Sequence, residues 1–239
     1  MLSRRLLISS VSLALVLAIV FGLYKLSSSR TYQAFGDLVA RVETGRPVIA
    51  LTFDDGPTAR FTNEVLGILD DLDVKATFFV TGREVTENPA ETRAIVAAGH
   101  ELGNHSYSHP RMVMKSYATY RSEIEKTDAA IRTIGYEKPL HFRPPYGKKL
   151  FGLPWYLSST GRTTVTWDVE PETYPEVADD LDAFVAHVVD RARSGSIVLM
   201  HVMYESRATS REALPLVVAG LRERGFTFVT VSELLEERK

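Results

Sequence analysis

The chain has 239 residues, of which 45% are apolar and 24% are charged, and it contains no cysteine. This composition is typical of globular proteins and excludes collagen-like, coiled-coil and disordered chains. The absence of cysteine excludes disulfides, thiolate nucleophiles and cysteine-ligated metal sites. Four of the 28 cations and none of the 30 acids lie in residues 1–30. The rest of the chain is therefore acidic, and we expect no nucleic-acid partner, because phosphate contacts need clustered Lys and Arg.

The first predicted element is an apolar helix. Residues 6–23 contain no charge, and a helix of that length spans about 27 Å, close to the hydrocarbon thickness of a bilayer. The apolar region of a cleaved signal peptide is usually only about 7–15 residues long. We therefore predict a membrane anchor in residues 1–30. It would make a single pass through the cytoplasmic (inner) membrane, with the remaining residues facing outside. The alternative is a secreted protein cleaved at the small residues Ser27 and Ser29.

Residues 31–46 are interpreted as a tether that includes a short amphipathic helix, and residues 47–239 as one catalytic domain. In that domain, β-branched and apolar runs alternate with segments of helical period. Strands are predicted near 48–53, 76–80, 101–104, 141–143, 164–167, 197–201 and 227–229. Helices are predicted near 62–69, 89–98, 117–134, 153–159, 178–193, 211–224 and 232–237.

Two Thr-x-x-Glu pairs, Thr209 with Glu212 and Thr230 with Glu233, have the spacing of capping boxes at helix starts. Seven strand-then-helix units indicate an α/β protein with parallel strands. A nucleotide-binding sheet would carry a glycine-rich loop after its first strand, but this chain has Asp54 there. This difference favours a distorted (β/α) barrel of about seven parallel strands over an open doubly wound sheet.

Polar residues follow several of the predicted strands. They are Asp54, Asp55, His105, His109, Arg143, Asp168, Glu170 and His201. In a β/α barrel the carboxyl ends of the strands form one face, where the active site lies. We therefore expect these side chains to converge in space.

His105 and His109 are four residues apart, so one turn of helix would place both imidazoles on the same side. Such a pair binds one metal ion when a carboxylate from elsewhere is added. Alone, the pair is more typical of surface or capping histidines than of a metal site, and Asp54-Asp55 before Gly-Pro is typical of a turn. Together, two adjacent carboxylates can serve one metal and one water, as metal-assisted hydrolysis requires.

These residues resemble the ordered motifs of a known family. The matching segments are Thr52-Phe53-Asp54-Asp55-Gly56-Pro57, His105-Ser106-x-x-His109, Arg143-Pro144-Pro145-Tyr146-Gly147 and Leu199-Met200-His201. They are similar to four of the five motifs of the polysaccharide deacetylases, the NodB-like enzymes of carbohydrate esterase family 4. The resemblance covers roughly residues 47–235.

The resemblance implies the barrel fold and a divalent metal, usually Zn²⁺, with Co²⁺ or another divalent ion as the alternative. By motif, Asp55, His105 and His109 would hold the metal. Asp54 would act as general base and His201 as general acid. The backbone N–H of Tyr146 would stabilise the oxyanion, and Arg143 would complete the catalytic residues.

The fourth motif departs from the family pattern. Where the family has Asp-x-x-Asp-Trp, this chain reads Glu170-Pro171-Glu172-Thr173-Tyr174. Glu170 retains a carboxylate at the first position. We therefore expect Glu170 to pair with Arg143 or to tune His201.

The sequence thus predicts a metal-dependent hydrolase that removes acetyl groups from N-acetylated amino-sugar polymers such as peptidoglycan. Its partners would be the acetylated polysaccharide and, through the N-terminal helix, the membrane. One alternative is an O-acetyl polysaccharide esterase with the same site. A glycoside hydrolase is disfavoured, because its two carboxylates should flank a scissile bond at about 5–9.5 Å. The remaining alternative is a non-catalytic, sugar-binding membrane protein.

Overall fold

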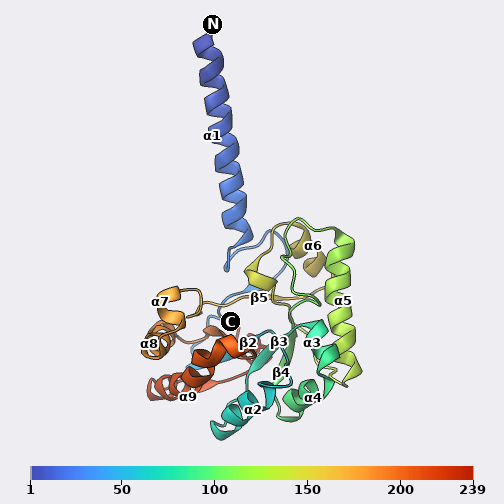
Figure 1. The fold of residues 1–239 in the computed structure, drawn as a ribbon, viewed down its shortest axis with the longest axis vertical. Helices are drawn as coiled ribbons and strands as arrows, with labels where there is room; N and C mark the ends of the chain where they lie inside the picture. The colour runs from blue at the N-terminus through green and yellow to red at the C-terminus, as the bar shows by residue number, and fades with distance from the viewer. Residues whose placement is uncertain (1, 239) are drawn as a thin grey trace.

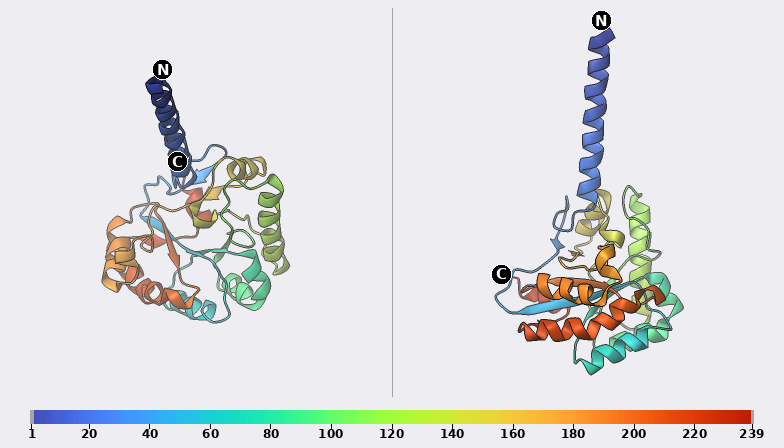
Figure 2. Two further views of the ribbon diagram at one scale, coloured as in Figure 1. Left: turned by 45° about the horizontal axis from the view of Figure 1, so that its top comes forward. Right: turned by 60° about the vertical axis from the view of Figure 1, so that its left-hand side comes forward.

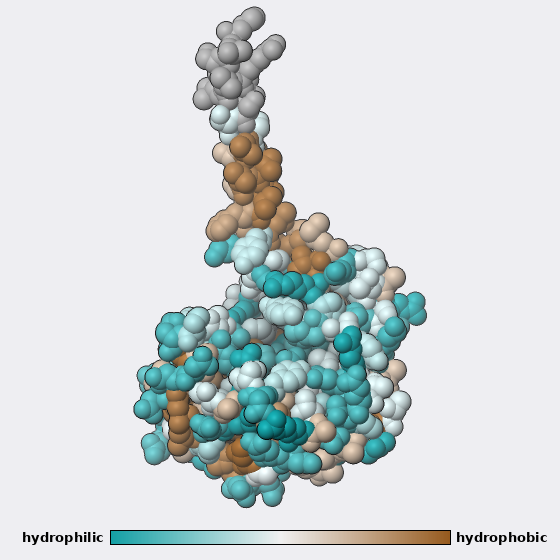
Figure 3. Space-filling view, viewed as in Figure 1, coloured by the Kyte–Doolittle hydropathy of each residue, from teal (hydrophilic) through white to brown (hydrophobic). Residues whose placement is uncertain are grey.

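The computed structural model describes residues 2–238, and it consists of a long N-terminal helix and a rounded α/β body (Figure 1). The helix, α1 (Leu2–Ser27), projects away from the body in every view (Figures 1 and 2). Its apolar side chains between Val11 and Leu23 are exposed, and they form the brown column of Figure 3. By length and composition, Ser10–Ser27 is apolar enough to cross a membrane, as a signal sequence also is.

The centre of the body is a parallel sheet around β2 (Val48–Asp54). Its order is β4 (Glu101–Asn104), β3 (Thr77–Val80), β2 and β6 (Ile197–His201), and β7 (Thr227–Phe228) also pairs with β2. Every residue of β2 is buried. This burial explains why β2 is mostly apolar, since parallel strands are covered on both faces. Its polar interior residue, Thr52, donates its hydroxyl to the carbonyl of Val198 at 2.7 Å.

A second parallel pair joins β1 (Leu38–Val39) to β5 (Thr164–Val165). Isolated bridges connect it to the main sheet: Phe142 pairs with Asn104 and Thr164, and Val169 pairs with Val198 of β6. The strand expected at 141–143 is thus reduced to one residue, Phe142, which forms two isolated bridges. The segment 31–46, for which a short helix was expected, instead contributes β1.

Helices cover the outside of the sheet (Figure 1). They are α2 (Thr62–Asp71), α3 (Gly82–Glu87), α4 (Pro89–Ala97), α5 (Tyr117–Thr133), α6 (Gly152–Ser159), α7 (Pro175–Ala178), α8 (Leu181–Arg191), α9 (Ala208–Glu223) and α10 (Val231–Glu236). The helix expected over 178–193 corresponds to α8, and the short helix α7 before it was not predicted. The capping box at Thr230 and Glu233 is confirmed. The capping box predicted at Thr209 and Glu212 is wrong. The helix α9 begins at Ala208 with Arg207 at its N-cap, so Thr209 lies inside the helix and no side chain caps it.

The strand register brings the functional residues to one edge. Asp54 at the end of β2 pairs with His201 at the end of β6 and with Phe79 of β3. Val80 of β3 pairs with Asn104, the residue before His105. Because all these strands run in parallel, their carboxyl ends meet and present these side chains to a shared space.

Candidate active site

The turn after β2 separates two adjacent carboxylates. Asp54 still belongs to the strand and is only 2% exposed, whereas Asp55 has a φ of 73° and is partly exposed. Gly56 follows with a φ of 72°, and a Cβ there would lie 2.7 Å from the side chain of Met203. The left-handed backbone therefore directs Asp55 differently from Asp54, and a glycine is required next to it.

His105 follows β4, and its imidazole is oriented by a backbone carbonyl. Nδ1 lies 2.8 Å from the carbonyl oxygen of Arg143, so Nδ1 carries the hydrogen and donates it. In the neutral ring Nε2 is then the atom available to a metal, and it lies 3.5 Å from Oδ2 of Asp54 and 3.9 Å from Oδ1 of Asp55. This orientation of the ring is typical of a histidine that ligates a metal.

His109 reaches the same point through a turn rather than through the expected helical turn. Ser106 and His109 both have positive φ, 66° and 55°. Glu123 of α5 accepts hydrogen bonds from the backbone N–H groups of Tyr107 and Ser108, at 3.0 and 2.8 Å, which fixes this turn. Nε2 of His109 lies 3.5 Å from Oδ1 of Asp55.

The donor atoms of Asp55, His105 and His109 lie within 4.8 Å of one another. Two imidazole nitrogens and one carboxylate oxygen form a donor set that fits Zn²⁺ and similar divalent ions with one position left open. Burial and the neighbouring His105 lower the pKa of His109, against the effect of the two aspartates. A lowered pKa favours the neutral imidazole that metal binding needs. The structure therefore contains a candidate metal site of the predicted composition.

Arg143 lies fully buried beneath this site. Its Nη1 donates to Oδ1 of Asp54 at 2.7 Å and to the hydroxyl of Thr52 at 2.8 Å, and its guanidinium stacks on Phe79 at 4.0 Å. Burial would raise the pKa of Asp54, but the charge of Arg143, with smaller contributions from His105 and His201, lowers it below its usual value. Asp54 is therefore a buried carboxylate that stays ionised at neutral pH.

His201 faces this carboxylate from β6, and its partner is Glu172. Its Nδ1–H donates to Oε2 of Glu172, and its backbone N–H donates to the same carboxylate at 3.0 and 3.1 Å. The hydroxyl of Ser210 donates to the other oxygen, Oε1, at 2.5 Å. Burial would lower the pKa of His201, but the hydrogen bond and charge of Glu172 raise it to about 9. His201 is therefore protonated at neutral pH.

From its sequence, Glu170 was expected to pair with Arg143 or to tune His201, but in the structure Glu172 binds His201. Glu170 instead accepts hydrogen bonds from Nε1 of Trp167 at 2.9 Å and from Nη2 of Arg30 at 2.5 Å. Burial lowers the pKa of Arg143, and the charge of Glu170 opposes this slightly, without a hydrogen bond between the two side chains. The sequence Glu-Pro-Glu contains two acids, and only the strand geometry shows that the second one reaches His201.

Two adjoining cavities open beside these residues, with volumes of about 480 and 640 Å³. Asp55, His109 and Tyr146 line both of them. The first also contains Asp54, His105, Trp167 and His201, and the second contains Arg83, Glu84, Tyr107 and Tyr204. Tyr146 is held at a φ of 58° between them. The candidate metal site thus lies where the two cavities join to form one cleft, because Asp55 and His109 line both.

Comparisons with known proteins identify the family of this chain. The family model of polysaccharide deacetylase matches residues 41–165. A peptidoglycan-N-acetylglucosamine deacetylase of Bacillus cereus is 34% identical over 205 residues, which cover 84% of this chain and 93% of that protein. The peptidoglycan-N-acetylmuramic acid deacetylase PdaC of Bacillus subtilis is 36% identical over 199 residues, or 83% of this chain. The match spans only 41% of the length of PdaC.

Solved structures show the same similarity. The Bc1960 peptidoglycan N-acetylglucosamine deacetylase superposes with a TM-score of 0.77 at 30% identity, over 84% of this chain and 94% of that chain. A mutant of BA3943, described as a family 4 pseudoenzyme with restored enzymatic activity, has a TM-score of 0.75 at 32% identity, over 84% of this chain and 72% of that chain. The chain belongs to the polysaccharide deacetylase family, the family 4 carbohydrate esterases.

Proposed function

We propose that the protein is a metal-dependent N-deacetylase that releases acetate from the acetamido groups of an amino-sugar polymer. The observation that carries this proposal is the position of one candidate metal site between an ionised Asp54 and a protonated His201. Relatives of this chain are named for the same reaction on peptidoglycan and on chitooligosaccharides.

Asp55, His105 and His109 would hold the ion, with Zn²⁺ or Co²⁺ as the fitting choices. A divalent ion at such a site polarises a carbonyl group and lowers the pKa of a bound water. His105 is fixed for this role by the carbonyl of Arg143.

The two flanking residues would move the protons. Asp54 accepts the proton of the attacking water, and its other oxygen stays fixed by Arg143. The Nδ1–H of His201 stays bound to Glu172, and His201 then donates its Nε2 proton to the departing amine. Without this proton the C–N bond does not break productively. The backbone N–H of Tyr146 would donate to the oxygen that becomes negative as water adds.

The proposed domain organisation and location of the chain follow from this function. Residues 47–239 form the catalytic domain, as a distorted (β/α) barrel that the bridges at Phe142 and Val169 support. Residues 1–30 form a single-pass anchor in the cytoplasmic membrane, and the catalytic domain works outside the cytoplasm. The exposed apolar surface of α1 supports this anchor.

Two other functions use the same fold. The leaving group of an O-acetyl ester depends less on protonation than the amine that leaves from an amide. The protonated His201 therefore favours N-deacetylation. A non-catalytic sugar-binding protein is a real alternative, because a structural relative is described as a pseudoenzyme. The complete set of Asp54, Asp55, His105, His109 and His201 favours catalysis.

The experiment is acetate release by the full chain in detergent from N-acetylated and O-acetylated oligosaccharides, with and without a chelator. We expect acetate from the N-acetyl substrate, loss of activity with chelator and recovery with Zn²⁺ or Co²⁺. Preferential release from the O-acetyl substrate would favour the esterase. New reducing ends without acetate would indicate a glycoside hydrolase, and binding without any product would indicate the sugar-binding protein.

A further inference from the structure

The end of α1 is packed against the catalytic domain. The carbonyl of Ser27 accepts the backbone N–H of Lys149 at 2.9 Å. The ammonium of Lys148 donates to the hydroxyl of Ser28, and the ammonium of Lys149 donates to the carbonyl of Ser29. Lys149 is only 1% exposed, so its charge depends on such acceptors. The residues after α1 therefore have a fixed position on the domain.

Arg30 extends this contact to the active site. Its guanidinium binds Glu170 at 2.5 Å and lies 4.9 Å from the ring of Trp167, while its carbonyl accepts the hydroxyl of Thr166 at 2.6 Å. Trp167 donates to the same Glu170 carboxylate. Arg30, Glu170 and Trp167 are thus one connected unit, although about 140 residues separate Arg30 from the other two.

The same segment faces the cleft. Tyr24, Ser28 and Arg30 line the cavity of about 480 Å³ that also contains Asp54, His105 and His201. Lys148 lies 4.3 Å from the ring of Tyr24 and holds this side chain on the domain. The space-filling view shows the surface hollowed below the base of α1 (Figure 3).

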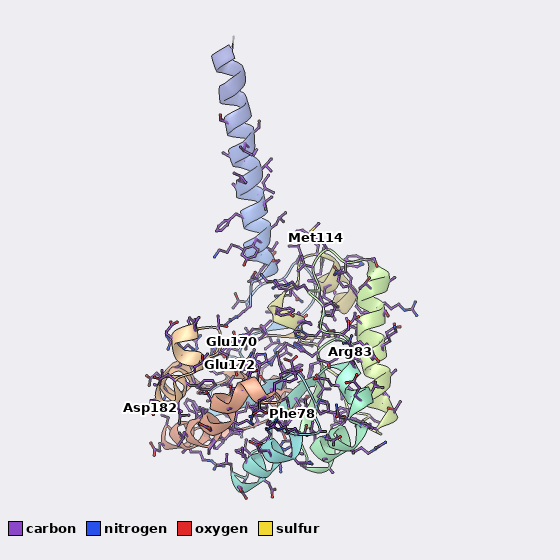
Figure 4. All side chains as sticks on the ribbon, viewed as in Figure 1. Phe78, Arg83, Met114, Glu170, Glu172 and Asp182 are labelled. Atoms are coloured by element: carbon purple, nitrogen blue, oxygen red, sulfur yellow. The ribbon has the colours of Figure 1, made fainter. Side chains whose placement is uncertain are left out.

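The two cavities share Asp55, His109 and Tyr146, and residues at the end of α1 line the first of them. Glu170 lines the first cavity and Arg83 the second, and the side-chain view labels them to the left and right below the base of the helix (Figure 4). A polymer that fills both cavities therefore passes the end of α1. The sugar unit in the first cavity would lie against Tyr24, Ser28 and Arg30.

We infer that the segment Tyr24–Arg30, which we call the juxtamembrane wall, is a substrate-binding wall of the catalytic cleft. It contacts the sugar unit next to the one being deacetylated, so that an oligomer binds better than a single sugar. This inference rests on the proposed function and extends it. A cut after Ser27 or Ser29 would remove part of the wall, so the working enzyme retains its N-terminal segment.

The first test uses the absence of native cysteine. Ser28→Cys creates a unique thiol at the wall, and Ala129→Cys, on the exposed face of α5, is the control. Both are made in the full chain in detergent with Asp54→Asn, so that the substrate stays intact. We expect a saturating N-acetylglucosamine pentamer to slow maleimide labelling of Ser28→Cys severalfold, and to leave labelling of Ala129→Cys unchanged.

The second test is kinetic and uses a matched pair of tyrosines. Tyr24 lines the cavity, whereas Tyr32 is exposed and lies outside it. Tyr24→Ala should raise KM for the pentamer by about 2- to 10-fold, the value of one aromatic contact, with kcat unchanged. Tyr32→Ala should change neither constant.

The outcomes separate the inference from the function on which it rests. Acetate release is measured on the same variants with Asp54 intact. Absence of acetate from all of them would refute the proposed function. Acetate release combined with unprotected Ser28→Cys and equal KM values for the two tyrosine variants would refute the juxtamembrane wall.

Discussion

The carboxylate of Glu172 binds both the imidazole Nδ1–H and the backbone N–H of His201. The second contact fixes the carboxylate relative to β6, and Ser210 holds it from α9. Burial would raise the pKa of Glu172, but these hydrogen bonds and the charge of His201 lower it below its usual value. The pair therefore keeps a positive charge on His201 next to the reacting groups.

This pairing predicts how activity depends on pH. His201, with a pKa of about 9, donates its proton below that pH, so kcat/KM should fall as the pH rises through about 9. Glu172→Gln removes the charge that raises this pKa. The alkaline limb should then move to lower pH, and kcat at neutral pH should fall by about 10- to 100-fold. The measurement is the pH dependence of acetate release.

Glu170→Gln is the matched control for that experiment. Glu170 contacts Arg30 and Trp167 rather than His201, so the alkaline limb should stay in place. A shift of the alkaline limb in Glu170→Gln, with none in Glu172→Gln, would return the role to Glu170.

Arg143→Met should destabilise the fold. The change leaves the buried carboxylate of Asp54 without its cation, which costs about 3–5 kcal/mol of unfolding free energy. Arg60→Met is the control, because Arg60 and Glu205 form an exposed pair worth about 0–1 kcal/mol. Chemical denaturation measures both. Adding Asp54→Asn to Arg143→Met should recover part of the loss, and strict additivity would contradict the pairing.

Gly103 pairs with Phe79 in the sheet and leaves room for the Phe79 ring, which contacts Arg143 of the site. A Cβ at Gly103 of β4 would lie 2.5 Å from the Phe79 ring, on which Arg143 stacks. Gly103→Ala should therefore lower the unfolding free energy by about 1–3 kcal/mol through overpacking. Gly67→Ala in α2 meets no atom within 4 Å and should raise it by about 0.5–1 kcal/mol. Thermal unfolding would show opposite shifts, and equal shifts would refute this packing.

His109→Ala should abolish metal binding. The variant removes one of three donors, and the two that remain cannot close the site. His187→Gln, on α8 and outside both cavities, is the control and should keep its metal. Elemental analysis of the purified full chains measures this directly, and full metal content in His109→Ala would exclude His109 as a ligand.

Much of the fold follows from local signals in the sequence. The apolar run of β2, the helical periods of α5 and α8, and the capping box at Thr230 are all recognisable without neighbours. Phe142 was predicted within a strand of three residues, but Phe142 alone forms bridges, because strand length depends on the pairing partners. β1 could not be predicted, since two residues become a strand only by pairing with β5.

The site was predictable where a motif places donors close together in sequence. Asp54, Asp55, His105 and His109 converge because parallel strands end at one edge. The backbone conformation of these residues was not predictable. His109 reaches the site through a turn in which its φ is positive, rather than through a helical turn. Glu172 and Arg30 escaped prediction for another reason, since each acts on residues far along the chain and carries no local signal.

The central claim is that two adjacent carboxylates have different tasks, and paired variants test it most directly. Metal content and acetate release are measured together for Asp54→Asn and Asp55→Asn in the full chain, with Zn²⁺ supplied. We predict that Asp54→Asn keeps its metal and loses turnover, because Asp54 handles the proton, whereas Asp55→Asn loses both. Equal metal content in the two variants, or turnover retained by Asp54→Asn, would contradict the account.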